Sequence, residues 1–222
     1  MRIGIQTWGS DGDIRPMIAL GRGLAAAGHR VILVLTSVDG KSYAAYARPP
    51  GFAVVHTRSP LAHRPRLMRD TAPAVVRLRH PARQLAAGWA DTFALSVPPM
   101  QAAARALAAD ADLLIGHFCL YPLQAAAESA GRPWVSVVLA HCAVPDPGRP
   151  ALEMPHLGPA LNPLGWRLAR ALVNRILRAP VNRLRRAEGL PPVDDVAENT
   201  WISRDLTLVA VSPAFYRPGP QA

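Results

Sequence analysis

The chain has 222 residues, of which 50% are hydrophobic, and a formal net charge of +10 that comes almost entirely from arginine. This length suits one sizeable hydrophobic core, and no apolar run approaches the roughly 18 residues of a membrane span. Only 6% of the residues are aromatic and no nucleic-acid-binding signature is present, so we expect no nucleic-acid partner.

Strand-like and helix-like patterns alternate along most of the chain. In chain order, we predict strands at 2–8, 30–36, 52–57, 112–117, 133–140 and 206–211. Between and after them we predict helices at 16–27, 41–48, 84–109 (interrupted near Pro98-Pro99), 121–130, 164–179, 181–188 and 194–203. The strands are largely continuous apolar runs, which is typical of a parallel sheet buried on both faces. The sequence therefore predicts an α/β fold class with a Rossmann-like, doubly wound parallel sheet.

Two connections are unusually long. Residues 58–83 are rich in arginine and proline, and we expect them to form a mobile excursion beside the carboxyl ends of the strands. Residues 141–162 form a second loop rich in proline and glycine.

The stretch from Gly9 to Pro16 joins the first strand to the first helix and holds two carboxylates, Asp11 and Asp13. Ligands of open α/β sheets bind beyond the carboxyl ends of the strands, so both acids lie where a substrate would bind. The Gly9 and Gly12 spacing is not that of a dinucleotide fingerprint, and no Gly-Lys-Ser/Thr follows. Because an Asp before a helix also caps it, capping and general-base roles are both open.

Two histidines, His117 and His141, lie at the carboxyl ends of the fourth and fifth predicted strands. The inferred topology turns both toward the crevice that holds Asp13, where either could contact a substrate. Each is also open to a structural role as a hydrogen-bonded core or loop histidine. The two cysteines form no disulfide framework, and no His, Cys and Asp cluster has metal-ligand spacing. We therefore expect no metal and no resident cofactor.

The same stretch carries a family resemblance. The pattern Thr7-x-Gly9-Ser10-x-Gly12-Asp13-Ile14-x-Pro16 is followed by Ala19-Leu20 and Gly28-His29-x-Val31. It resembles the opening of the amino-terminal domain of GT-B glycosyltransferases, of the family 28 type and of the sterol and antibiotic glucosyltransferases. Weaker resemblance continues at residues 162–164, 182–185, 189–191 and 211–213.

This resemblance implies an acceptor-binding domain at 1–216, the start of an interdomain linker at 217–222, and a separate nucleotide-sugar domain that the chain lacks. The implied reaction is inverting transfer of a hexose from a nucleotide sugar, such as a UDP-sugar, to a hydroxyl of an apolar acceptor (a sterol, a lipid or a natural-product aglycone). Asp13 would be the general base. The other expected substrate contacts are Ser10, Asp11, Gly12, His117 and His141. The chain alone would be inactive, and a cytoplasmic location is expected.

Residues 164–179 predict an amphipathic helix with Leu164, Leu168, Leu172 and Ile176 on one face and arginines mostly elsewhere. The favoured interpretation is a core-facing helix with a solvated basic face. The other is peripheral attachment to an anionic membrane, which fits a lipid acceptor.

Two further functions remain open from the sequence. One is a non-catalytic module of the same fold that holds a ligand or a partner. The other is an NAD(P)-binding oxidoreductase domain, in which Asp39, just past the second strand, would bind the ribose.

Overall fold

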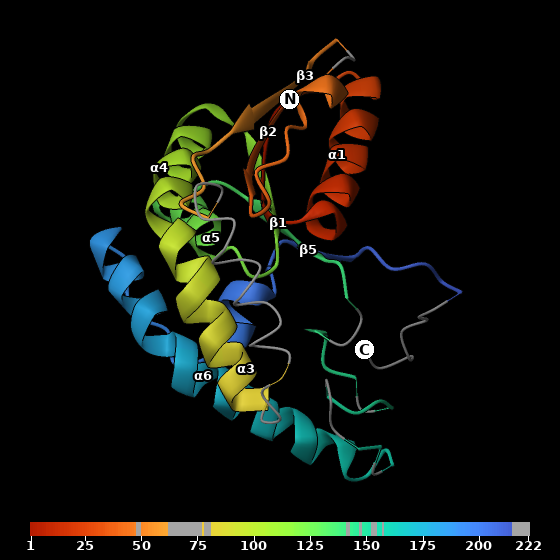
Figure 1. Cartoon of the computed structure of the whole chain (residues 1–222), viewed down its shortest axis with the longest axis vertical. Coiled ribbons are helices and arrows are strands. Elements are labelled where there is room, and N and C mark those ends of the chain that lie inside the picture. The colour runs from red at the N-terminus through yellow and green to blue at the C-terminus, as the bar shows by residue number, and fades with distance from the viewer. Residues whose placement is uncertain are drawn as a thin grey trace.

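A computed structural model of the chain describes residues 1–47, 50–61, 77, 81–140, 143–146, 148–151, 155–156 and 158–214. Six parallel strands form one sheet in the order β3-β2-β1-β4-β5-β6 (Figure 1). The strands are β1 Arg2–Gly9, β2 Arg30–Ser37, β3 Phe52–His56, β4 Leu113–His117, β5 Trp134–Val138 and β6 Leu206–Val209. The predicted α/β, doubly wound parallel sheet is confirmed.

Helices cover the sheet on both faces. They are α1 Asp11–Ala26, α3 Pro81–Gly88, α4 Ala94–Asp110, α5 Tyr121–Ser129 and α6 Asn162–Ala187. On one face, apolar residues of α1 pack against β1, β2 and β3; on the other, those of α4, α5 and α6 form a second core (Figure 1). In the described part of the chain, no helix is both long enough and apolar enough to cross a membrane.

Three predicted helices differ from the structure. The predicted break at Pro98-Pro99 lies instead at a π-helical turn, η2, Trp89–Phe93, which joins α3 to α4. The predicted helix at 41–48 is reduced to a single 3₁₀ turn, η1, Ala44–Tyr46. The predicted helix at 194–203 is a π-helical turn, η4, Ala197–Trp201. Most of the predicted excursion at 58–83 lies outside the described residues, so its mobility stays a prediction.

Helix α6 corrects two predictions at once. It continues through Pro180, where we expected a break, because Val181 and Leu184 beyond the proline are buried in the core. The buried side of the helix is formed by Val173, Leu177, Val181 and Leu184. The prediction was Leu164, Leu168, Leu172 and Ile176. Leu164 and Leu168, which we expected to face the core, are each 62% exposed.

A buried arginine ties α5 to α6. The Arg185 side chain is 3% exposed, and its guanidinium donates two hydrogen bonds to the Glu128 carboxylate at 2.8 and 2.9 Å. Its Nε donates to the Pro191 carbonyl at 2.8 Å. Hydrogen bonds from the guanidinium offset the cost of burying it, so the helix keeps its place against α5.

The junction of β1 and α1 places the first carboxylates. Gly9 has a φ of +136°, and α1 begins at Asp11, five residues before the predicted start at Pro16. A Cβ at Gly9 would lie 2.1 Å from Asp13 Oδ2, far inside contact distance. Glycine is therefore required at residue 9 both by the backbone conformation and by the side chain above it.

We predict that Gly9→Ala lowers the free energy of unfolding by about 2–4 kcal/mol, because it adds backbone strain and displaces the Asp13 cap. Gly12→Ala is the matched control. No atom lies within 4 Å of a Cβ built at Gly12, and alanine favours helix, so its effect should stay within about 1 kcal/mol. Chemical denaturation measures both. Equal stability of the two variants would contradict this account of the junction.

Candidate active site

Asp13 and His117 both lie at the topological switch point of the sheet. β1 and β4 are neighbours, but β2 and β3 lie on one side of them and β5 and β6 on the other. Asp13 follows the carboxyl end of β1, and His117 is the last residue of β4. Parallel sheets open a crevice at this point, and ligands bind there.

The Asp13 carboxylate has one engaged oxygen and one free one. Oδ2 accepts a hydrogen bond from the Ser10 backbone N–H at 3.0 Å, which caps the start of α1. Oδ1 has no hydrogen-bond partner within the described ranges. The side chain is half-buried. The capping role that the sequence left open is therefore real, and it leaves one oxygen for a ligand.

Asp11, two residues earlier, is fully engaged. Its carboxylate accepts hydrogen bonds from Lys41 Nζ at 2.9 Å and from the buried Tyr43 hydroxyl at 2.7 Å, and Arg15 Nε lies at 3.4 Å. These bonds, that from Lys41 first, lower the pKa of Asp11 to about 2. Burial and the bond to Asp11 raise the pKa of Tyr43 to about 12. Asp11 thus joins the segment after β2 to the first turn of α1.

His117 is buried, with an exposed fraction of 7%. Burial lowers the pKa of its imidazole, and the negative charge of Asp13 opposes that shift only in part. The ring is therefore neutral at pH 7.

Cys119 contacts this ring, which the sequence analysis missed. Its Sγ lies 3.1 Å from His117 Nδ1. Burial, together with the charge of Asp13, raises the pKa of the thiol to about 12, so the sulfur keeps its proton. A lone cysteine two residues beyond a strand gives no signal in the sequence that it will contact that strand's last side chain.

The other predicted contacts are only partly placed. Ser10 and Gly12 are exposed at the start of α1, beside Asp13, and Gly12 is open to close approach by a ligand. His141 lies outside the described residues, so its role stays a prediction. Among the residues that the structure describes, no group of three His, Cys, Asp or Glu side chains could hold a metal ion.

An aromatic wall lies beside the end of β1. Trp8 packs edge-on against Phe93, Phe93 stacks on Trp89, and both Phe93 and Trp89 contact Tyr121, with ring centroids 4.5 to 5.9 Å apart. These residues come from β1, η2 and the start of α5. The sequence gives no sign of the wall, because its members lie up to 113 positions apart and meet only through the order of the strands.

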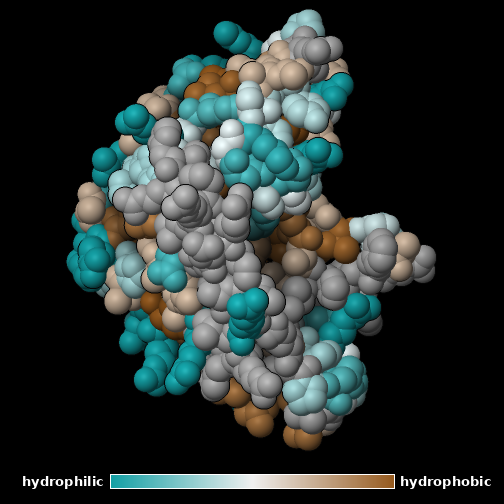
Figure 2. All heavy atoms as spheres, viewed as in Figure 1, coloured by the Kyte–Doolittle hydropathy of each residue, from teal (hydrophilic) through white to brown (hydrophobic). Residues whose placement is uncertain are grey.

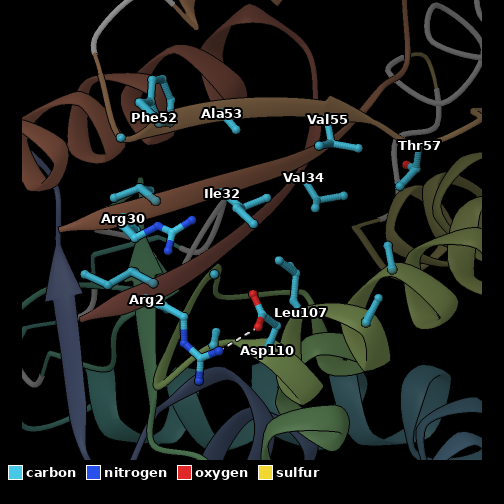
Figure 3. Close-up of a pocket in the computed structure, with 17 residues that line it drawn as sticks. Arg2, Arg30, Ile32, Val34, Phe52, Ala53, Val55, Thr57, Leu107 and Asp110 are labelled. Carbon is cyan, nitrogen blue, oxygen red and sulfur yellow. Dashed lines mark hydrogen bonds and ion pairs between the residues drawn. The ribbon is translucent and has the colours of Figure 1, made fainter.

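A cavity of about 660 Å³ lies elsewhere in the domain. It runs between α4 and the face of β1, β2 and β3 that α1 leaves open, and the side chains of Ile32, Val34, Val55 and Leu107 point into it (Figure 3). Its Arg2 guanidinium is held by Asp110 at 2.7 Å. Neither Asp13 nor His117 lines this cavity.

The fold and the crevice define a class: the chain resembles, over nearly its whole length, the amino-terminal half of a GT-B glycosyltransferase. This confirms the resemblance that the sequence motif predicted. No protein-family profile matches the chain. A curated relative, the glycosyltransferase GtfE of Amycolatopsis orientalis, is 27% identical over 227 residues, which cover 96% of this chain and 51% of that protein. The chain thus spans about half the length of the relative.

Solved structures show the same fold. SsfS6, a glycosyltransferase of Streptomyces sp. SF2575, matches with a TM-score of 0.59 and 19% identity over 98% of this chain and 52% of its own. It has also been solved in complex with thymidine diphosphate. CalG4, the calicheamicin glycosyltransferase, matches with a TM-score of 0.56 and 21% identity over 98% of this chain and 49% of its own.

We predict that the His117 ring titrates below its ordinary value of 6.5, because burial disfavours the charged form. Asp13→Asn removes the charge that raises the His117 pKa, so the midpoint should move lower still. Asp11→Asn is the control and should leave it unchanged. Nitrogen-15 NMR of labelled histidine across pH 4–8 measures all three proteins. An unchanged midpoint in Asp13→Asn would show that the two groups do not interact.

Proposed function

We propose that the chain is the acceptor-binding half of a glycosyltransferase. The enzyme would move a hexose, with inversion, from a nucleotide sugar to a hydroxyl of an apolar acceptor such as a natural-product aglycone, a sterol or a lipid. The observation that carries this proposal is the Asp13 carboxylate, held through one oxygen and free at the other, at the switch point beside His117. The likeness to GtfE supports it.

Asp13 acts as the general base. Its free Oδ1 accepts the proton of the acceptor hydroxyl while that oxygen forms a bond to the anomeric carbon of the sugar. The bond between this carbon and the diphosphate oxygen breaks on the opposite face, and its electron pair leaves with the nucleoside diphosphate. The hydrogen bond from Ser10 holds the carboxylate in one orientation, which favours proton transfer along a fixed direction.

His117 acts as a neutral hydrogen-bond donor. The Cys119 thiol keeps its proton and lies against Nδ1, where an S–H donor pairs best with an imidazole lone pair. The ring proton is then on Nε2. The Nε2–H donates a hydrogen bond that orients either the acceptor oxygen or the Asp13 carboxylate. Of the aromatic wall, Phe93 and Tyr121 are buried, so the half-buried rings of Trp8 and Trp89 are the ones that could contact an apolar acceptor.

The nucleotide sugar binds to another part of the enzyme in this proposal. In Rossmann-like domains phosphate groups bind at the start of the first helix, where backbone N–H groups and the helix dipole attract anions. Here that turn holds Asp11 and Asp13, and Asp13 takes up the Ser10 N–H. Two carboxylates repel a diphosphate, so the donor requires a separate site.

The alternatives find less support. Asp39, the acid that an NAD(P) domain would direct to the ribose, is bonded to Ser37 Oγ at 2.6 Å and to Lys41 Nζ at 3.1 Å. A non-catalytic binding module would have the same fold and the same aromatic wall. It gives no reason for a half-free carboxylate beside a buried neutral histidine, and kinetics separates it from a transferase.

We predict that the chain by itself binds UDP- and TDP-sugars weakly or not at all, for the electrostatic reason just given. Isothermal titration calorimetry measures this directly. Micromolar affinity for either nucleotide sugar would contradict the proposed division between the acceptor-binding and donor-binding halves.

For the chain joined to a carboxy-terminal nucleotide-sugar half, such as that of GtfE, we predict that Asp13→Asn lowers kcat about 10²–10⁴-fold. Asparagine keeps the size of the side chain and caps comparably, so stability should change by no more than about 1 kcal/mol. Steady-state kinetics and denaturation measure the two quantities.

The control for this prediction is Asp11→Asn. It removes a carboxylate from the same helical turn, yet Asp11 is engaged by Lys41 and Tyr43, so its effect on kcat should be far smaller. Near-full turnover of Asp13→Asn, or unfolding of that variant, would assign Asp13 to capping alone. His117 and His141 would then be the first candidates for the base.

A further inference from the structure

Three leucines at the start of α6 are exposed to an unusual degree. Leu161 is 51% exposed, and Leu164 and Leu168 are each 62% exposed. Leu164 and Leu168 lie one helical turn apart, and Leu161 lies just before the helix, so all three lie on one side. Apolar side chains gather at the lower end of the molecule, over the beginning of α6 (Figure 2).

The same side of the helix carries unpaired positive charge. Arg175 follows Leu164 by 11 residues, or about three turns, so the two side chains lie on the same side of the helix. Arg167 and Arg178 flank that side. All three are exposed, and the described residues offer none of them an ion pair or a hydrogen bond. Arg170, by contrast, is bound by Asp195 and Glu198. We call the six residues Leu161, Leu164, Arg167, Leu168, Arg175 and Arg178 the α6 ridge.

The rest of the helix presents the ridge rigidly. Val173 and Leu177 on the opposite side are buried in the core, so the helix cannot turn to hide the leucines. Residues 162–187 include no Asp or Glu, so no acidic side chain of the helix competes for the arginines. Trp166 Nε1 donates to the Asp146 and Arg149 carbonyls at 3.1 and 3.0 Å, which ties the ridge to the segment after β5.

We propose that the α6 ridge binds an anionic phospholipid surface. The leucines enter the boundary between headgroups and acyl chains, and the three arginines pair with lipid phosphates, as in helices that lie in the plane of a membrane interface. The unpaired arginines favour an anionic partner. The exposed leucines favour a partner that has an apolar layer beneath its charged surface. A nucleic acid meets the first requirement but not the second. The binding needs no transfer chemistry, so it extends beyond the proposed function.

Vesicle co-sedimentation at 0.1 M salt tests this with the whole chain. We expect it to bind vesicles that contain phosphatidylglycerol, to bind pure phosphatidylcholine much less, and to lose affinity as salt increases. Leu164→Ser with Leu168→Ser should weaken binding at least tenfold. Arg175→Gln and Arg178→Gln should each weaken it about fivefold.

Two matched controls lie elsewhere on the surface. Leu206→Ser changes a leucine on β6 that is 49% exposed, and Arg22→Gln changes an exposed arginine on α1. Both should bind like the unmodified chain, and circular dichroism is used to check that every variant is folded. Asp13→Asn should also bind normally, so a failure of the transfer proposal and a failure of this one can be told apart.

Three results would overturn the proposal. One is equal binding to anionic and neutral vesicles. Another is unchanged binding of the ridge variants, or a loss as large in the controls. The third is a chain that does not bind vesicles but self-associates in sedimentation velocity. If the leucine variants then become monomeric, the ridge is a contact between copies of the chain.

Discussion

The close approach of the Asp13 carboxylate to Gly9 organises the junction of β1 and α1. A strand that ended in any other residue would push this carboxylate away, since a Cβ would lie 2.1 Å from its Oδ2. With glycine there, the carboxylate folds back onto the Ser10 N–H and fixes the first turn of α1 directly against the end of β1. One small residue thus brings an anionic group to the switch point of the sheet and holds it there.

The carboxylates of Asp11 and Asp13 lie in the same helical turn but differ in their hydrogen-bond partners. Asp11 meets a lysine, a tyrosine and an arginine, which keep it ionised and occupied. Asp13 accepts one hydrogen bond from a backbone N–H, and its negative charge acts on the buried imidazole of His117. Two residues of the same type in one helical turn therefore differ. Asp11 connects segments of the fold, whereas Asp13 has one carboxylate oxygen with no hydrogen-bond partner among the described residues.

The sequence predicted the fold well where the physical signal is local. Continuous apolar runs bounded by turn residues located all six strands, because strands buried on both faces need such runs. It failed where packing overrides local preference. Pro180 lies inside α6 rather than at its end, and the leucines at the start of α6 are exposed while Val173 and Leu177 are buried. Periodicity shows that a helix has an apolar side, but not which of two apolar sides meets the core.

The sequence by itself determined the class of fold, and it placed Asp11 and Asp13 at the carboxyl end of β1, because glycines, carboxylates and strand ends are all visible in order along the chain. Only the tertiary structure decided which partners each group has. The contact of Cys119 with His117, the engagement of Asp11 by Lys41 and Tyr43, and the aromatic wall all join residues from separate elements. Such contacts depend on strand order and helix rotation, which a single sequence does not specify.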